Sequence, residues 1–403
     1  MKYLNKWFKV AFSKFNNNTP TGSHLEFLAR NIRRVFRSFW LRKINIFDTD
    51  YSKEVLISYI IPKFNSRNSH HPKKQEISEI AKLFEEMGFN VDVSHYKYKP
   101  IGLDYSKYDI VFGFGEPFDR SFYADQCSAK RIHYATGAHV CFQNEAELER
   151  ISNLKDRKGE LLKPRRAVEK TWSASTYLSD AIISLGNEFT VKSYKEHFDG
   201  PIYNIPVTAY NYFPGNEINR NIEEARNHFL WFGSGGLVHK GLDLCLEAFK
   251  ELPKKHLNIC GPREEDFFEL YKEELFHRDN IHYHGWVEVS SREFEKIVEN
   301  TAFVIFPSCS EGGGSSVITA MKTGLIPLVT EEASVPLGNF GFLLKDTSVD
   351  YIINRVQEVS SLPVDELRNR SEESFEYSKT KHSLGNFRSE LREALNRILN
   401  GEY

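Results

Sequence analysis

Two glycine-rich loops hold the groups whose types and spacing could do chemistry. The first reads GSGGLVHKG over residues 233–241 and contains Lys240, and the second reads SEGGGSS over residues 310–316 and contains Glu311. Glycines let a backbone approach a ligand closely, and the N–H groups at a helix N-terminus attract anions. A lysine beside them adds a positive charge. Together the two loops predict a diphosphate site that needs no metal.

Each glycine-rich loop is expected to join a buried strand to a helix. Apolar runs at 229–232 and 303–306 read as strands, and helical patterns follow the loops at 242–251 and from 315 onwards. The carboxyl ends of parallel strands meet at one edge of a sheet, so both loops should face the same crevice. The same alternation predicts strands at 257–260, 281–284 and 326–329, and helices at 267–276, 292–300 and 384–399.

The first half of the chain shows a similar alternation. A run at 54–64 reads as a strand, a helix at 76–87 ends at Gly88, and the Pro- and Asn-containing stretch 206–216 reads as a linker. Further short strands are predicted at 91–93, 109–114, 131–134 and 181–184. We therefore predict an α/β protein with two parallel, doubly wound sheets.

Length, charge and cysteine content narrow the class further. With 403 residues the chain should form two domains with a cleft, and its net charge of −2 gives no reason to expect a nucleic-acid partner. The five cysteines lie far apart and form no CxxC pair, which predicts reduced thiols and no zinc site. The sequence has neither an apolar run of about 18 residues nor the apolar core of a signal peptide, so we expect a cytoplasmic protein.

Positive charge is concentrated at the N-terminus. Residues 1–43 hold five Lys, five Arg and one Glu, a net of +9 that leaves −11 for the remainder. Residues 2–15 and 25–40 each set a basic face against an aromatic and aliphatic one, as in helices that lie on an anionic membrane surface. A solvated helix pair packed on the first domain is an equally weighted alternative.

A dinucleotide-binding fold is the obvious competitor for the first loop. The loop lacks the full G-x-G-x-x-G pattern, and the strand at 257–260 ends at Cys260 and Gly261, where an acid for the ribose would be expected. The dinucleotide interpretation therefore fits poorly.

Three segments resemble one known family. They read WFGSGGLVHKGLD at 231–243, PSCSEGGG at 307–314 and AMKTGLIPLV at 320–329. They resemble the nucleotide-sugar domain of GT-B fold glycosyltransferases, specifically the large retaining family 4, over about 229–345 and more weakly over 54–215. The resemblance implies two Rossmann-like domains with a central cleft, metal-independent sugar transfer and a C-terminal helix that crosses back to the first domain.

This resemblance suggests a division of the chain into four parts. Residues 1–50 form a basic amphipathic helical segment, 51–212 an acceptor domain, 213–380 a nucleotide-sugar domain and 381–403 the returning helix.

The resemblance also implies roles for individual residues. Lys240 would bind the donor diphosphate and Glu311 the transferred sugar, while His139 would face the donor sugar. Each residue also has a structural alternative. His139 could be a buried structural histidine, Lys240 a solvated lysine and Glu311 a surface acid. The expected donor-binding residues are Gly233, Ser234, Gly235, Lys240, Trp286, Glu311, Gly313, Gly314, Ser315, Ser316 and Thr319.

Several of these positions carry a second interpretation. Ser315 and Ser316 should act first as helix caps and then as phosphate contacts. Trp286 would contact the base, or else be a core aromatic. His70 and His71 would line the acceptor side, or else be exposed loop residues.

Two positions depart from the family pattern. Thr319 stands where a second acid usually grips the ribose, and Ser234 stands where a basic residue is common. A ribose contact would then be weaker or come from elsewhere, for example Glu331 or Glu332. These changes fit either a divergent enzyme or a protein that has lost catalysis.

The resemblance implies transfer of a sugar from a nucleoside-diphosphate donor to a hydroxyl of a glycan or lipid-linked acceptor, in cell-surface polysaccharide synthesis and without a cofactor. The alternatives are a catalytically inactive glycan- or nucleotide-binding partner and a nucleotide-sugar epimerase on the same fold.

Overall fold

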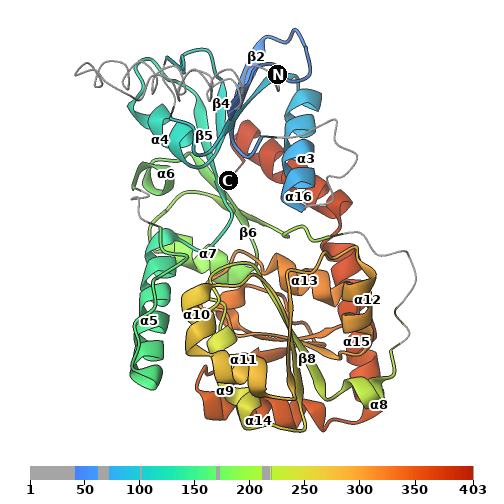
Figure 1. Cartoon of the computed structure of the whole chain (residues 1–403). Coiled ribbons are helices and arrows are strands. Elements are labelled where there is room, and N and C mark those ends of the chain that lie inside the picture. The colour runs from blue at the N-terminus through green and yellow to red at the C-terminus, as the bar shows by residue number, and fades with distance from the viewer. Residues whose placement is uncertain are drawn as a thin grey trace, which may run out of the picture.

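A computed structural model describes residues 41–61, 72–99, 102–168, 173–210, 218 and 220–402. The helices predicted at 2–15 and 25–40, and the pair His70 and His71, lie outside the described residues. Within them the chain forms two α/β domains, one above the other in Figure 1, each built on its own sheet.

The first sheet has seven strands in the order β1-β3-β2-β4-β5-β6-β7. Every pairing is parallel except β1 with β3. Because Arg42 and Lys43 form β1, the sheet begins within the segment that was expected to be helical up to residue 50. The strands are β1 Arg42–Lys43, β2 Lys53–Tyr59, β3 Phe89–His95, β4 Ile110–Gly113, β5 Lys130–Ala135, β6 Ala181–Leu185 and β7 Ile202–Ile205.

Helices connect these strands and cover the sheet. Predicted strand positions are confirmed, although β2 ends at Tyr59. The helices are α3 Pro72–Glu86, α4 Glu116–Arg120, the 3-10 helix η1 Ser121–Tyr123, α5 Val140–Lys158, α6 Ser173–Tyr177 and α7 Glu188–Lys195.

The second sheet has six strands in the order β10-β9-β8-β11-β12-β13, all parallel. Its order reverses between β8 and β11, and the two glycine-rich loops follow these strands, so both lie at a topological switch point where ligands bind in such sheets. The strands are β8 His228–Phe232, β9 His256–Cys260, β10 Ile281–Gly285, β11 Phe303–Phe306, β12 Ile326–Thr330 and β13 Phe342–Leu344.

The predicted extent of one helix in the second domain was wrong. The stretch predicted as a helix over 267–276 forms two short helices, because Tyr271 leaves the helical conformation at φ −107° and ψ 24°. The helices are α8 Ile222–Ala225, α9 Leu242–Lys250, α10 Glu265–Leu270, α11 Lys272–His277, α12 Arg292–Glu299, α13 Ser315–Met321, the 3-10 helix η2 Glu331–Ala333, α14 Val349–Ser360, α15 Val364–Lys381 and α16 Leu384–Asn400.

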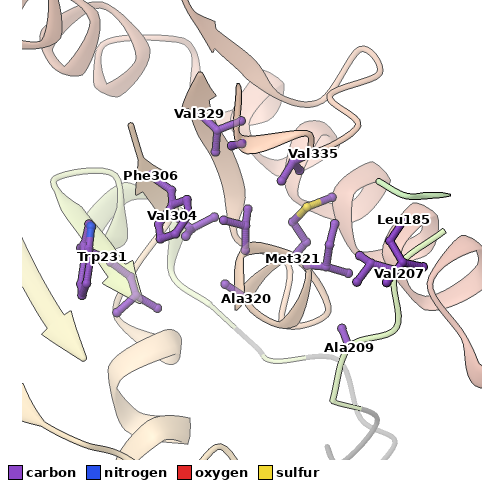
Figure 2. Packing of buried hydrophobic residues seen from close by; sticks show 14 of the residues in the cluster. Leu185, Val207, Ala209, Trp231, Val304, Phe306, Ala320, Met321, Val329 and Val335 are labelled. Atoms are coloured by element: carbon purple, nitrogen blue, oxygen red, sulfur yellow. The ribbon is translucent and has the colours of Figure 1, made fainter. Parts of the chain in front are cut away.

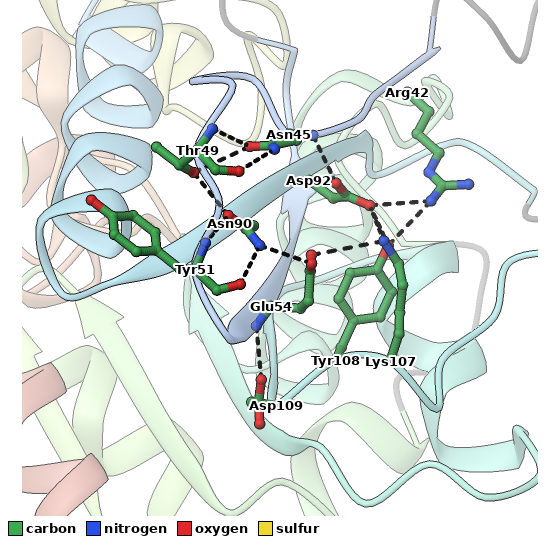
Figure 3. Close-up of polar contacts among 10 residues, drawn as sticks. All are labelled: Arg42, Asn45, Thr49, Tyr51, Glu54, Asn90, Asp92, Lys107, Tyr108 and Asp109. Atoms are coloured by element: carbon green, nitrogen blue, oxygen red, sulfur yellow. Dashed lines mark hydrogen bonds and ion pairs between the residues drawn. The ribbon is translucent and has the colours of Figure 1, made fainter.

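A polar network fixes the start of the first sheet. The buried carboxylate of Asp92 accepts hydrogen bonds from Arg42 at 3.2 Å, Lys107 at 2.9 Å and the Tyr108 hydroxyl at 2.6 Å, as Figure 3 shows. Burial alone would raise the pKa of Asp92, but the hydrogen bonds from Tyr108, the amide of Asn45 and Lys107 lower it. The network therefore holds β1 against β3.

Apolar packing continues across the domain boundary. Figure 2 shows Leu185, Val207 and Ala209 of the first domain near Met321 and Val335 of the second, within one buried cluster. This continuous packing favours a fixed arrangement of the two domains.

The C-terminal helix α16 returns to the first domain and packs on α3, as Figure 1 shows. Arg388 on α16 contacts Glu79 on α3 at 2.7 Å and also pairs with Glu86. Lys130 donates to the carbonyl of Ile398 at 2.9 Å. Among the described helices, none has the length and apolar character needed to cross a bilayer.

Candidate functional site

Lys240 and Glu311, predicted from separate loops, form an ion pair between Nζ and Oε1. Their side chains are 5% and 14% exposed. Burial lowers the pKa of Lys240, although the negative charge of Glu311 opposes this effect. Burial would raise the pKa of Glu311, but the positive charge of Lys240 outweighs burial and the pKa is lowered. The structure thus joins the two loops through one buried pair of opposite charges.

Close backbone approach between the loops makes this pair possible. Gly241 has φ +70°, and a side chain there would come within 2.4 Å of the Pro307 carbonyl oxygen. The indole of Trp231 donates to the carbonyl of Lys240 at 3.1 Å, and the amide of Glu311 donates to the carbonyl of Glu332 at 2.9 Å. Each member of the pair is therefore held at its backbone.

Loop 310–316 also touches the first domain. A Cβ on Gly312 would lie 2.4 Å from the Thr136 carbonyl oxygen, and one on Gly313 would lie 3.0 Å from Gly186 and Val207. Within the described part of the chain, no hydrogen-bond acceptor is recorded for the amides of Gly313, Gly314 and Ser315. These amides therefore remain available to an anion between the domains.

The expected capping role of Ser315 and Ser316 was wrong. The N-cap of α13 is Gly314 in the left-handed conformation, and no side chain caps the helix. The hydroxyl of Ser315 instead donates to the carbonyl of Thr208 at 2.8 Å, which ties α13 to the end of the first domain. Thr319 is buried, and its hydroxyl donates to the carbonyl of Ser315 at 2.7 Å.

The remaining expected donor residues lie around the first loop and after β10. Ser234 is exposed and Gly235 is partly exposed, while the amide of Gly233 donates to the carbonyl of Cys260 at 3.1 Å. Trp286 is 64% exposed, which excludes the alternative of a core aromatic. It stands on the surface loop that follows β10.

His139 is buried at the start of α5. Its Nδ1 accepts from the amide of Cys141 at 3.3 Å, so the ring caps the helix, and its ring stacks on His197 with centroids 4.0 Å apart. Burial and the neighbouring histidines lower its pKa to about 4. The imidazole is therefore neutral at pH 7. It belongs to the loop whose Thr136 and Gly137 touch Gly312.

His139, Cys141 and His197 have ligand atoms within 4.8 Å of one another, the spacing of a possible metal site. The two imidazole planes, however, are only 26° apart. Ring nitrogens bind metals in the plane of the ring, so nearly parallel rings do not direct their lone pairs at one ion. We assign this group to ring stacking.

Sequence reasoning missed a second buried pair, between His239 of the first loop and Glu147 of α5. His239 Nδ1 faces the Glu147 carboxylate and Nε2 faces the carbonyl of Ser310 at 2.6 Å. Hydrogen bonds from His239 and from two loop amides outweigh burial and lower the pKa of Glu147, so its carboxylate is ionised. The two ring nitrogens of His239 therefore link the Glu147 carboxylate of the first domain to the Ser310 carbonyl of the second glycine-rich loop.

Helix α5 supplies further contacts to the second domain, beside which it lies in Figure 1. Arg150 donates to the carbonyl of Pro307 at 3.0 Å, Arg157 pairs with Asp243 and Glu247, and Lys158 approaches Glu274 at 3.3 Å. Glu147, Arg150 and Arg157 are three and then seven residues apart, which places them on one helix face, and this pattern is a signal that could have revealed the contact.

A cavity of about 710 Å³ lies on the first domain. Its lining includes Tyr105, Asp119 and Tyr123, and no residue of either glycine-rich loop. We place the candidate site at the two glycine-rich loops. Their glycines, buried charge pair and unbonded amides are more specific features of a binding site than the volume of the first-domain cavity.

Residues 216–376 match the family model described as glycosyl transferases group 1. The structure resembles TarM with a TM-score of 0.52 at 16% identity, over 72% of this chain but only 54% of that chain, so this chain spans about half of TarM. It resembles Anabaena HepE, solved with UDP and glucose, with a TM-score of 0.54 at 10% identity over 86% of this chain and all of that one. It resembles WaaG with a TM-score of 0.52 at 14% identity, over 84% of this chain and 99% of that one. No curated protein sequence shows a significant match.

The chain therefore has the two-domain GT-B fold of the glycosyltransferases that it resembles. Its second domain carries the glycosyl transferases group 1 match, which covers both glycine-rich loops and the Lys240–Glu311 pair.

Proposed function

We propose that the protein transfers a sugar from a nucleoside-diphosphate donor to a hydroxyl of a glycan or lipid-linked saccharide, with retention of anomeric configuration, in the synthesis of a cell-surface polysaccharide. The observation that carries this proposal is the buried pair of Lys240 and Glu311 beside the unbonded amides of Gly313 and Gly314. Two of the similar structures support it, since WaaG is a glycosyltransferase involved in lipopolysaccharide biosynthesis and HepE was solved with UDP and glucose.

In the proposed reaction the anomeric C–O bond breaks and the nucleoside diphosphate leaves with increased negative charge. Lys240 and the amides of loop 310–316 stabilise that charge without a metal. Glu311 binds hydroxyls of the transferred sugar and supports the positive charge that develops on its ring. The leaving phosphate takes the proton of the acceptor hydroxyl on the same face, as the family resemblance implies. His139, neutral and buried, positions the donor sugar from the first domain.

A donor screen tests this proposal. Nucleoside-diphosphate sugars are mixed with the protein and candidate acceptors, and released nucleotide and product are measured by mass spectrometry. Nucleotide release that requires an acceptor supports transfer. Release of an altered donor sugar without an acceptor would instead identify an epimerase.

An inactive binding partner is the second candidate function, favoured by Thr319 and Ser234. The Thr319 hydroxyl is already engaged with the Ser315 carbonyl, and Ser234 brings no charge. Such a protein would bind nucleoside diphosphate or glycan in calorimetry and show no turnover with any donor. Turnover lost in Glu311→Gln would exclude this candidate.

Association with the cytoplasmic face of a membrane forms part of the proposal, through the basic residues 1–43. Because Arg42 bonds to Asp92 and Lys43 belongs to β1, a deletion of residues 1–40 leaves the first sheet intact. The full chain is expected to sediment with anionic vesicles at low salt and the shortened chain to stay in solution. Equal sedimentation of both would contradict membrane binding by this segment.

A further inference from the structure

A first-domain segment reaches over the first glycine-rich loop and is fixed there by its backbone. The amides of Arg165 and Arg166 donate to Glu147 Oε1 at 2.7 and 3.0 Å, and Gln143 donates from its side chain to the Arg166 carbonyl at 2.6 Å. The other oxygen of Glu147 holds His239, the neighbour of Lys240. One carboxylate thus fixes both the segment and the loop.

The side chain of Arg166 lies against the loop at Gly236. A Cβ at Gly236, where φ is +90°, would come within 2.5 Å of Arg166 Cγ and 2.9 Å of Cδ. Only a glycine leaves room for the arginine stem at this point. The Arg166 charge reaches the ion pair beyond, because it contributes to the lowered pKa of both Lys240 and Glu311.

Arg166 differs from its neighbour in how its charge is used. Arg165 directs its guanidinium to Asp266 at 2.7 Å. For Arg166 no carboxylate partner is recorded within the described ranges, and its side chain is exposed. An arginine placed beside an anion site with its guanidinium uncommitted can bind phosphate oxygens in a bidentate manner.

We propose that Arg166 is the second cation of the donor-diphosphate site and is supplied by the first domain. This inference rests on the proposed function. It gives the site a charge that Ser234, in the second domain, does not supply. Because Lys240 and Arg166 come from different domains, a bound diphosphate would be held by both domains.

Calorimetry on the full chain tests the inference with two adjacent variants. Wild type, Arg166→Gln and Arg165→Gln are titrated with UDP, GDP, ADP and the matching monophosphates. Arg166→Gln is expected to weaken binding of the preferred diphosphate about tenfold, the worth of one charge-assisted phosphate contact, and to change monophosphate binding less than about twofold. Arg165→Gln removes the same charge one residue away and should leave both affinities within about twofold. Arg166→Lys should recover part of the loss.

The outcomes separate this inference from the proposed function. If wild type binds a diphosphate and Arg166→Gln binds it equally well, the role of Arg166 is overturned while the proposed function stands. A loss that is equal for monophosphate and diphosphate, or equal in Arg165→Gln, overturns it too. A wild type that binds none of the diphosphates overturns both.

Discussion

Neutralising Glu311 and Lys240 one at a time is expected to move nucleoside-diphosphate affinity in opposite directions. Glu311→Gln removes a negative charge beside the predicted phosphates and releases the ammonium of Lys240 from its ion pair. Two like charges about 5 Å apart repel by about 1 kcal/mol in water and about 3 kcal/mol at an effective dielectric of about 20. Because the pair is only 5% and 14% exposed, the site lies between these limits. Diphosphate should therefore bind at least about fivefold more tightly.

Lys240→Met removes an attraction of similar size and should weaken diphosphate binding at least about fivefold. It also leaves the Glu311 carboxylate buried without its partner, which should lower the free energy of unfolding by about 3 kcal/mol. The double variant Lys240→Met/Glu311→Gln should recover part of that stability.

Isothermal titration with the preferred nucleoside diphosphate, at fixed ionic strength, measures the affinities, and urea denaturation measures the stabilities. Weaker binding in Glu311→Gln, or unchanged binding in both variants, would refute the placement of the phosphates beside this pair.

Three further predictions concern other parts of the site and fold. Gly313→Ala places a methyl group 3.0 Å from Gly186 and Val207 at φ +97°, so it should cost about 1–3 kcal/mol in urea denaturation; an unchanged midpoint would contradict this domain contact. Trp286→Ala, at a 64% exposed site, should alter stability by less than about 0.5 kcal/mol but weaken nucleotide binding about fivefold, and leave pyrophosphate binding unchanged; equal binding of nucleotide would exclude the base contact. Burial lowers the pKa of His133, His139 and His382 to about 4. Between about pH 6.5 and pH 4 the unfolded chain therefore takes up protons that the folded chain does not, so stability should fall as the pH drops through this range. The expected loss at pH 5.5 is about 1 kcal/mol for each histidine. His382→Asn keeps a donor for the Val207 carbonyl and should lose its share of this fall; a slope identical to that of wild type would contradict it.

The second domain was largely predictable because its signals are local. Apolar runs of four or five residues followed by glycine-rich loops identified β8 and β11, and the order of the elements required parallel pairing. The same locality brought Lys240 and Glu311 together correctly, since both lie just beyond the carboxyl ends of neighbouring strands.

The contacts between the domains were not predictable in the same way. The pair of His239 and Glu147 joins residues 92 positions apart, and the placement of Arg166 on Gly236 depends on how α5 crosses to the second domain. Each of these residues taken alone looks like an ordinary surface or core residue. Ser315 was misread for a related reason, because its hydroxyl bonds to Thr208 in the other half of the chain instead of capping its own helix.

The most direct test of the proposed reaction is acceptor-dependent nucleotide release by wild type and by Glu311→Gln, assayed with the donor that the screen selects. Glu311→Gln is expected to bind nucleoside diphosphate at least as tightly as wild type and to lose at least about a hundredfold in transfer, since a neutral amide cannot support the positive charge that develops on the sugar. Full transfer activity in Glu311→Gln would contradict the assignment of this site.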